Sequence, residues 1–207
     1  MAEYKLVYDR DNSREVLMQA LEQAEERLII VCPWLTNKGI NQSIIDSFKK
    51  LLKSNTCIDI GWGYRGDIID VNQLEFSENY FRKKIINDWK YNALNKLEDL
   101  EKQFSGKFRL KLLGTHEKYL VCDNKFAMLG SHNLLTSSEN NQEREVGILT
   151  TDIDIIQGLN DRFDNAESLG KPEDVSIDFD YFEREAMGYN AVGGGMSYEQ
   201  YLDVFGY

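Results

Sequence analysis

Apolar residues follow two spacings along this chain, and segments with one spacing alternate with segments with the other. Short, dense apolar runs predict strands at residues 4–8, 27–32, 57–62, 108–113 and 146–150. Apolar residues three or four apart predict helices at residues 13–24, 44–53 and 153–168, and one long helix or two across residues 77–103. Strands alternating with helices predict an α/β sandwich, in which helices flank a mixed, largely parallel β-sheet.

One stretch, residues 114–133, carries most of the chemical information. It reads Gly-Thr-His-Glu-Lys-Tyr-Leu-Val-Cys-Asp-Asn-Lys-Phe-Ala-Met-Leu-Gly-Ser-His-Asn. Its two apolar runs, residues 119–122 and 126–129, are separated by three polar residues and predict a hairpin. Residues two apart on a strand share a face, so we expect His116 and Lys118 to point the same way.

Further polar residues follow this pair at close range. Ser131 and Asn133 come directly after Gly130, and they share a face if the segment stays extended. Gly130 permits a close approach of the backbone to a ligand. Asp123 belongs to the same candidate site by position, but its parity is opposite to that of His116. That parity favours a structural or ion-pairing role over direct catalysis.

These residue types suit attack on a phosphodiester without a metal. An imidazole titrates near pH ~6.5, so a neutral His116 is a competent nucleophile at neutral pH. Lys118 can hold a phosphate oxygen and offset charge in the transition state, and Ser131 and Asn133 can donate to the other oxygens. A carboxylate usually supports a catalytic histidine, and Glu145 is the best candidate in the sequence.

The pattern His116-x-Lys118-x4-Asp123, followed by Gly-Ser-x-Asn and later by Glu145, resembles the motif of the phospholipase D superfamily. A weaker similarity, the apolar run that ends in Pro-Trp at residues 28–34, lies upstream, and the resemblance covers roughly residues 10–168. It implies that two copies of the motif act together. One histidine forms a phosphohistidine intermediate, and the other protonates the leaving oxygen and then activates water.

The motif occurs once in 207 residues. Short members of the family obtain the second copy by homodimerisation, so the resemblance implies a homodimer with a shared active site and no metal or cofactor. It also favours a nuclease that acts on DNA more than on RNA, and a component of a DNA-processing or defence assembly is one form that this expectation takes. The alternatives are a non-catalytic module that binds nucleic acid or scaffolds a complex and, less favoured, a phospholipid phosphodiesterase.

Charge complicates the expectation of nucleic-acid binding. The net charge is −11 and the pI about 4.7, whereas surfaces that bind nucleic acid are usually basic. Arg109 and Lys111 share a face by parity on the strand that leads to His116, so we expect them to bind substrate phosphates. The acidity suggests that a protein partner contributes part of the binding surface.

The remaining features concern compartment and organisation. Cys32, Cys57 and Cys122 all lie in apolar runs and are interpreted as core thiols of a reduced compartment. Because the N-terminus lacks a signal-like segment and no apolar run is long enough to span a membrane, we expect a cytoplasmic protein without membrane contact. His132 is expected to face away from the site.

The expected domain covers residues 1–170, and an acidic tail rich in aromatic residues covers residues 171–207. Two interpretations of the tail remain open. It docks a protein partner or occupies the cleft as a mimic of nucleic acid, or it packs on its own domain.

Overall fold

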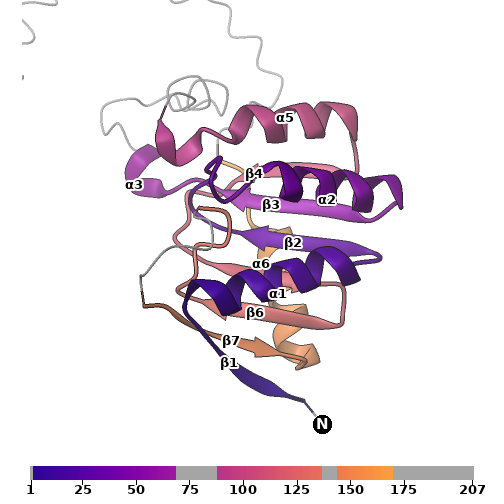
Figure 1. Cartoon of the computed structure of the whole chain (residues 1–207), viewed down its shortest axis with the longest axis vertical. Helices are drawn as coiled ribbons and strands as arrows, with labels where there is room; N and C mark the ends of the chain where they lie inside the picture. The colour runs from indigo at the N-terminus through magenta and orange to yellow at the C-terminus, as the bar shows by residue number, and fades with distance from the viewer. Residues whose placement is uncertain (1, 69–87, 137–143, 170–207) are drawn as a thin grey trace, which may run out of the picture. The chain divides into compact units, whose positions relative to one another are not determined.

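The computed structural model of this chain describes residues 2–68, 88–136 and 144–169. The predicted tail and the first half of the helical pattern across residues 77–103 therefore lie outside the described residues. The described chain forms a seven-stranded sheet with helices on both faces (Figure 1).

Strands and helices alternate up to residue 112, as the sequence predicts, and the next three strands follow with no helix between them among the described residues. The strands are β1 (Tyr4–Tyr8), β2 (Arg27–Val31), β3 (Cys57–Trp62), β4 (Phe108–Leu112), β5 (Tyr119–Cys122), β6 (Phe126–Gly130) and β7 (Val146–Thr150). The helices are α1 (Asp9–Gln23), α2 (Gln42–Lys53), α3 (Arg65–Ile68), α5 (Leu94–Gln103) and α6 (Ile153–Asn165), with a 3-10 turn, η1, at Trp89–Tyr91. None of these helices has the length and apolarity that a membrane span requires.

The strand order is β1-β7-β6-β5-β2-β3-β4. The pairs β2–β3 and β3–β4 are parallel, whereas β1–β7, β6–β7, β5–β6 and β2–β5 are antiparallel. The prediction of a mixed sheet is thus confirmed, but the expectation that it is largely parallel is wrong. The reason is the β5–β6 hairpin, which joins the sheet beside β2 in the opposite direction and sets the direction of every strand beyond it.

Two apolar clusters hold the helices to the sheet. The larger lies on the face covered by α1, α2 and α5, where Leu28, Ile30 and Ile60 are fully buried against helical residues such as Leu17 and Phe48. The smaller lies on the opposite face, where α6 covers the sheet through residues that include Ile156 and Phe163. In Figure 1, α1 and α2 lie in front of the strands and α6 lies behind them.

Helix boundaries follow local hydrogen bonding. α2 begins after Asn41, whose side chain accepts from the Ile44 amide at 3.1 Å, and α6 begins after Asp152, whose carboxylate accepts from the Asp154 amide at 2.9 Å. α1 begins at Asp9, four residues before the predicted start at Ser13, so the helix follows β1 directly. Ser13 instead lies within the helix, and its hydroxyl donates to the Arg10 carbonyl oxygen.

The predicted hairpin is confirmed, with β5 and β6 joined through residues 123–125. Its turn places Asp123 at a φ of 49°, a left-handed conformation that Asp tolerates better than most residues. The Asp123 carboxylate accepts hydrogen bonds from the amides of Glu25, Glu26 and Arg27 at 2.7–2.9 Å. Asp123 therefore ties the end of β5 to the start of β2.

Removal of this carboxylate should destabilise the fold. Asp123→Ala leaves three backbone amides without their acceptor and should lower the free energy of unfolding by roughly 3 kcal/mol in urea titrations at pH 7. Asp99→Ala, in an exposed i,i+3 pair on α5, is the matched control and should cost under about 1 kcal/mol.

The free energy of unfolding that Asp123→Ala loses should depend on pH. Burial raises the pKa of Asp123, but the hydrogen bonds from the amides outweigh it and hold the pKa below its usual value. The carboxylate therefore stabilises the fold fully above the unfolded pKa of about 3.9, and this contribution is lost as the pH falls through the lower folded value. A difference between wild type and Asp123→Ala that stayed constant into acid would contradict this assignment.

Candidate active site

The candidate residues lie along one row of strand ends, here called an edge of the sheet. Strands β1, β2, β3, β4 and β6 end at this edge, and β5 and β7 begin there, because only β5 and β7 run opposite to β2. His116 and Lys118 precede β5 on this edge, Ser131 and Asn133 follow β6, and Glu145 precedes β7. Five of the predicted site residues are thus brought to one edge from three segments.

The segment that carries His116 runs beside the end of β3. The Leu113 amide donates to the Trp62 carbonyl oxygen at 2.7 Å, and the Thr115 amide donates to that of Gly63 at 2.6 Å. Between them, Gly114 has a φ of 63°, which favours glycine and turns the chain away from β4. These contacts fix the backbone that carries His116.

His116 and Lys118 meet, as the shared parity predicts. Lys118 Nζ lies 3.2 Å from His116 Nε2 and donates to the His116 carbonyl oxygen at 2.8 Å. An ammonium group can donate hydrogen bonds but cannot accept them, so Nε2 is the acceptor and the proton of the neutral ring lies on Nδ1. His116 is exposed to solvent.

Electrostatics keep the pair in a reactive form. Partial burial of the ring lowers the pKa of His116, and the Lys118 charge lowers it further, so the neutral form predominates at pH 7. Burial also lowers the pKa of Lys118, although the Glu145 carboxylate opposes this shift. A neutral imidazole beside a cation is suited to attack an anionic phosphate.

The loop after β6 is fixed by close backbone packing. A methyl group at Gly130 would lie 2.4 Å from the Gly147 Cα, so only glycine fits there. The Ser131 hydroxyl donates to the Val146 carbonyl oxygen at 3.2 Å and accepts from its amide at 3.0 Å. Ser131 is therefore engaged with β7, although its side chain stays exposed.

Asn133 does not share an extended segment with Ser131, because the chain turns after Gly130. Its Oδ1 is buried without a hydrogen-bond partner among the described residues. The buried Arg10 stabilises this loop by donating to the carbonyl oxygens of Asn133 and Leu134 at 2.9 and 3.0 Å. His132, which lies between the two candidates, is 1% exposed and packs against Gly147.

Glu145 is held at the start of β7 by Asp9. The Asp9 amide donates to the Glu145 carbonyl oxygen at 2.9 Å, and the Asp9 carboxylate accepts from the Glu145 amide at 3.1 Å. This reciprocal pair also explains why α1 starts directly after β1.

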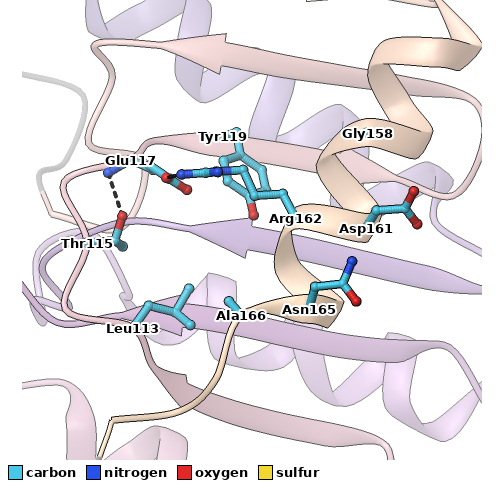
Figure 2. A pocket seen from close by; sticks show the side chains of 9 residues that line it. All are labelled: Leu113, Thr115, Glu117, Tyr119, Gly158, Asp161, Arg162, Asn165 and Ala166. Carbon is cyan, nitrogen blue, oxygen red and sulfur yellow. Dashed lines mark hydrogen bonds and ion pairs between the residues drawn. The ribbon is translucent and has the colours of Figure 1, made fainter.

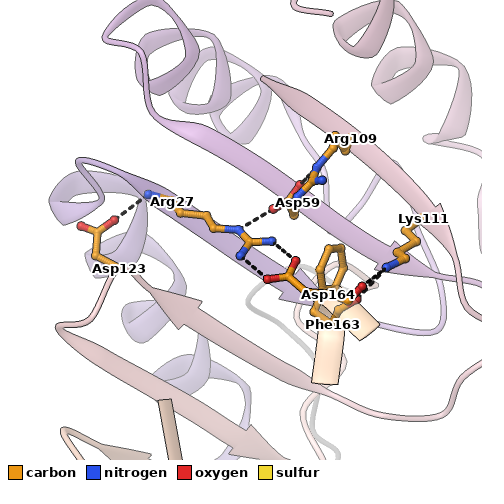
Figure 3. Close-up of polar contacts among 7 residues, drawn as sticks. All are labelled: Arg27, Asp59, Arg109, Lys111, Asp123, Phe163 and Asp164. Carbon is orange, nitrogen blue, oxygen red and sulfur yellow. Dashed lines mark hydrogen bonds and ion pairs between the residues drawn. The ribbon is translucent and has the colours of Figure 1, made fainter. Parts of the chain in front are cut away.

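Three other predicted site residues contact the scaffold instead. Asp123 lies at the opposite edge of the sheet from His116, beyond the length of β5. Arg109 donates to the buried Asp59, with Nη2 2.9 Å from Oδ2, and Lys111 Nζ donates to the Phe163 carbonyl oxygen at 2.7 Å (Figure 3). Arg27 joins the same group and bridges Asp59 to Asp164, so these cations tie β2, β3 and β4 to the end of α6.

A cavity of about 530 Å³ lies between α6 and the segment that leads into β5 (Figure 2). An ion pair between Arg162 and Glu117 crosses it, and the buried Tyr119 hydroxyl beside it has no hydrogen-bond partner among the described residues. Its lining residues are Leu113, Thr115, Glu117, Tyr119, Gly158, Asp161, Arg162, Asn165 and Ala166. Across residues 2–68, 88–136 and 144–169, no cluster of three or more His, Cys, Asp or Glu residues forms a metal site.

Two residues at the site were not identified from the sequence. Trp34, after β2, and Tyr64, after β3, place their rings 6.0 and 5.3 Å from the His116 ring, measured between centroids. Trp34 follows a proline at the end of a predicted strand, a position that could have indicated a role at the site. No signal in the sequence pointed to Tyr64.

Comparisons with known proteins show the family to which this chain belongs. A family model described as cardiolipin synthase, PLD-like domain, matches residues 17–166, and the chain therefore belongs to this phospholipase-D-like family. The resemblance inferred from the sequence is confirmed. We found no significant match among curated proteins.

Solved structures share the fold at low sequence identity. NucT from Helicobacter pylori is 16% identical with a TM-score of 0.54, and Nuc from Salmonella typhimurium, a phospholipase D family member, is 12% identical with a TM-score of 0.54. Each alignment covers 83% of this chain and 100% of the other. Phosphatidylserine synthase from Haemophilus influenzae is 15% identical with a TM-score of 0.59, over 92% of this chain but 47% of that protein.

The charge of Lys118 should control the protonation of His116. In an NMR titration, the His116 ring should show a pKa below ~6.5, and Lys118→Met should raise that pKa because one of its two lowering influences is gone. Lys53→Met, on the exposed end of α2, is the matched control and should leave the pKa unchanged. An unaltered His116 pKa in Lys118→Met would contradict the described pairing.

Proposed function

We propose that this chain is a metal-independent phosphodiesterase that cleaves nucleic acid, DNA in preference to RNA, through a phosphohistidine intermediate. The observation that carries the proposal is the 3.2 Å approach of Lys118 Nζ to Nε2 of a neutral, exposed His116. It joins a nucleophile and a phosphate-binding cation in one site on a phospholipase-D-like fold.

The proposed reaction has two displacements at phosphorus. In the first, the Nε2 lone pair of His116 forms a bond to phosphorus, and the bond from phosphorus to the leaving oxygen breaks. Lys118 shifts its hydrogen bond from Nε2 to a phosphate oxygen, and the leaving oxygen takes a proton from a second, protonated imidazole. In the second, that imidazole removes a proton from water, the water oxygen bonds to phosphorus, and the N–P bond breaks.

The other residues of the site have supporting roles in this proposal. Asn133 donates hydrogen bonds to phosphate oxygens, and Ser131 does so once its hydroxyl turns away from the Val146 carbonyl oxygen. Glu145 offsets the positive charge that develops on the rings. Asp123 contributes through the fold, by fixing β5. Because Arg109 and Lys111 are held by scaffold groups, we assign them no more than a secondary role in substrate binding.

Nucleic acid is the favoured substrate because the motif and the aligned region match short members of the family. The aligned region spans the whole of NucT and Nuc but less than half of the phosphatidylserine synthase. The motif resembles that of short, single-motif family members, which tend to be nucleases. With a net charge of −11, the chain suits a DNA-processing or defence assembly in which a protein partner supplies part of the binding surface.

The second imidazole of the proposed reaction comes from a second copy of the chain, and one apolar surface suits that contact. Tyr8 pairs with Val146 and Leu6 with Ile148 across β1 and β7, and Tyr4 lies on the same face. These five side chains, here called the β1/β7 stripe, are 41–59% exposed. The five side chains carry no charge on a strongly acidic chain, which favours a contact between two copies there. The carboxylate of Asp152, which accepts from the Tyr4 hydroxyl, lies at one end of the stripe.

The catalytic proposal is tested with DNA in EDTA. Wild type should cleave DNA without a metal, and His116→Ala and Lys118→Ala should each lose at least ~10³-fold in rate because they remove the nucleophile or its cation. Lys53→Ala, an exposed lysine far from this edge, is the matched control. Binding without cleavage would favour the non-catalytic module, and cleavage of a phospholipid alone would favour the lipid enzyme.

The dimer is tested at the β1/β7 stripe. Wild type should sediment as a dimer, and Leu6→Glu should convert it to an inactive monomer, because burying an unpaired carboxylate at an interface is strongly unfavourable. Lys5→Glu changes the neighbouring residue on the opposite face of β1 and should remain dimeric and active. Adding excess His116→Ala to wild type should also suppress activity through mixed dimers.

Two results would count against the dimer. A wild-type monomer that is fully active would remove the need for a second copy. A dimeric, active Leu6→Glu would leave the nuclease proposal in place but would exclude this stripe as the contact.

A further inference from the structure

The rings of Trp34 and Tyr64, here called the aromatic cradle, lie next to the His116 ring. The Trp34 ring meets the His116 ring at 72° with 6.0 Å between centroids, and the Tyr64 ring meets it at 60° with 5.3 Å. Trp34 and Tyr64 also contact each other, at 65° and 5.8 Å. These separations and angles lie in the range of favourable edge-to-face aromatic contacts, so the imidazole has a preferred orientation between the two rings.

One carboxylate, that of Asp67, connects the aromatic cradle to the neighbouring turn. Asp67 accepts from Trp34 Nε1 at 2.9 Å, from the Tyr91 hydroxyl at 2.9 Å and from Lys90 Nζ at 2.8 Å. The Tyr91 hydroxyl in turn accepts from the Tyr64 amide at 3.1 Å. Asp67 therefore fixes Trp34 directly and the backbone of Tyr64 through one intermediate group.

The usual support of a catalytic histidine is a carboxylate that accepts directly from the ring. Among the described residues, no carboxylate hydrogen-bonds to the His116 ring, whose hydrogen-bonding contact is with Lys118. The orientation of the ring is therefore supplied by the two aromatic side chains and, behind them, by Asp67.

We propose that Trp34, Tyr64 and Asp67 are positioning residues that hold the His116 ring for attack on phosphorus, in place of a directly bonded carboxylate. This inference rests on the proposed function. The edge-to-face contacts with the indole and phenol rings hold the imidazole in one orientation, so less freedom is lost when Nε2 meets phosphorus. Asp67 stabilises the arrangement at neutral pH because its carboxylate stays ionised: burial raises its pKa, but the hydrogen bonds from Lys90, Trp34 and Tyr91 outweigh it.

Kinetics of cradle variants test the proposal. Trp34→Ala should lower kcat at least tenfold with KM within twofold, on DNA and on the small substrate bis(p-nitrophenyl) phosphate, because the ring loses its orientation but the phosphate contacts remain. Trp34→Phe should recover most of kcat, since it restores an aromatic face. Trp89→Ala is the matched control, since Trp89 is 64% exposed on the neighbouring turn η1.

A double-mutant cycle tests the connection through the indole. Asp67→Asn should lower kcat on its own, and its effect should be smaller in a Trp34→Phe background, where no indole N–H remains to be held. If the two effects are additive, Asp67 does not act through Trp34, and that part of the proposal is overturned.

The pH profile supplies an independent readout. The charged and titratable groups around His116 are Lys118 on its own segment, Tyr64, the Asp67–Lys90 pair behind Trp34, and Cys32 and Glu145, which act on Lys118. Trp34→Ala exposes the ring to water, so the His116 pKa measured by NMR and the acid limb of kcat/KM should both rise. Since the chain has two histidines, the His116→Ala spectrum assigns the signals.

Several outcomes overturn the proposal. A raised KM with unchanged kcat in Trp34→Ala would mean that Trp34 contacts the substrate instead, for example by stacking on a base. An unchanged kcat and His116 pKa would remove the positioning role altogether. If Trp34→Ala fails to fold, Trp34→Phe and Asp67→Asn carry the test. If wild type cleaves no diester, the proposed function fails, whereas the NMR titration still tests the positioning of the ring.

Discussion

The arrangement of this molecule depends on one carboxylate that holds two strands together. Asp123 accepts from three consecutive amides at the start of β2 and so fixes the register of β5 beside it. The four residues between Lys118 and Asp123 are β5 itself, Tyr119–Cys122. The spacing within the motif therefore equals the length of one strand. Asp123 anchors one end of β5, and His116 and Lys118 lie at the other end, at the opposite edge of the sheet.

That edge gathers groups with complementary chemistry. The backbone there is tightly constrained, by the Gly130–Gly147 approach and by the Asp9–Glu145 pair, so the site is built on rigid elements. The conditions around His116 keep its ring neutral and beside a cation. A single copy nevertheless presents one exposed imidazole at this edge from the described residues, because His132 is buried there, and the uncharged β1/β7 stripe starts at the same edge, at Tyr8 and Val146.

Much of the fold could be predicted because its signals are local. The hairpin followed from two apolar runs around a polar turn, and β1, β3 and β7 have the predicted bounds. The direction of the strands could not be read in the same way. Whether β5 lies parallel or antiparallel to β2 depends on hydrogen bonds between segments about ninety residues apart, such as the one from the Arg27 amide to Asp123. Similarly, Arg109 and Lys111 have the right charge for phosphate, but their partners Asp59 and Phe163 come from other elements.

The sequence by itself determined the alternation of elements, the family and the pairing of His116 with Lys118, because residue identity and spacing two apart fix each of these within one segment. The tertiary structure decided how that pair is supported. Trp34, Tyr64 and Asp67 lie 49 to 82 residues before His116 in the sequence and reach it because the parallel strands β2 and β3 end at the edge where β5 begins. Contacts of this kind depend on how separate strands pair, and local residue patterns do not encode that pairing.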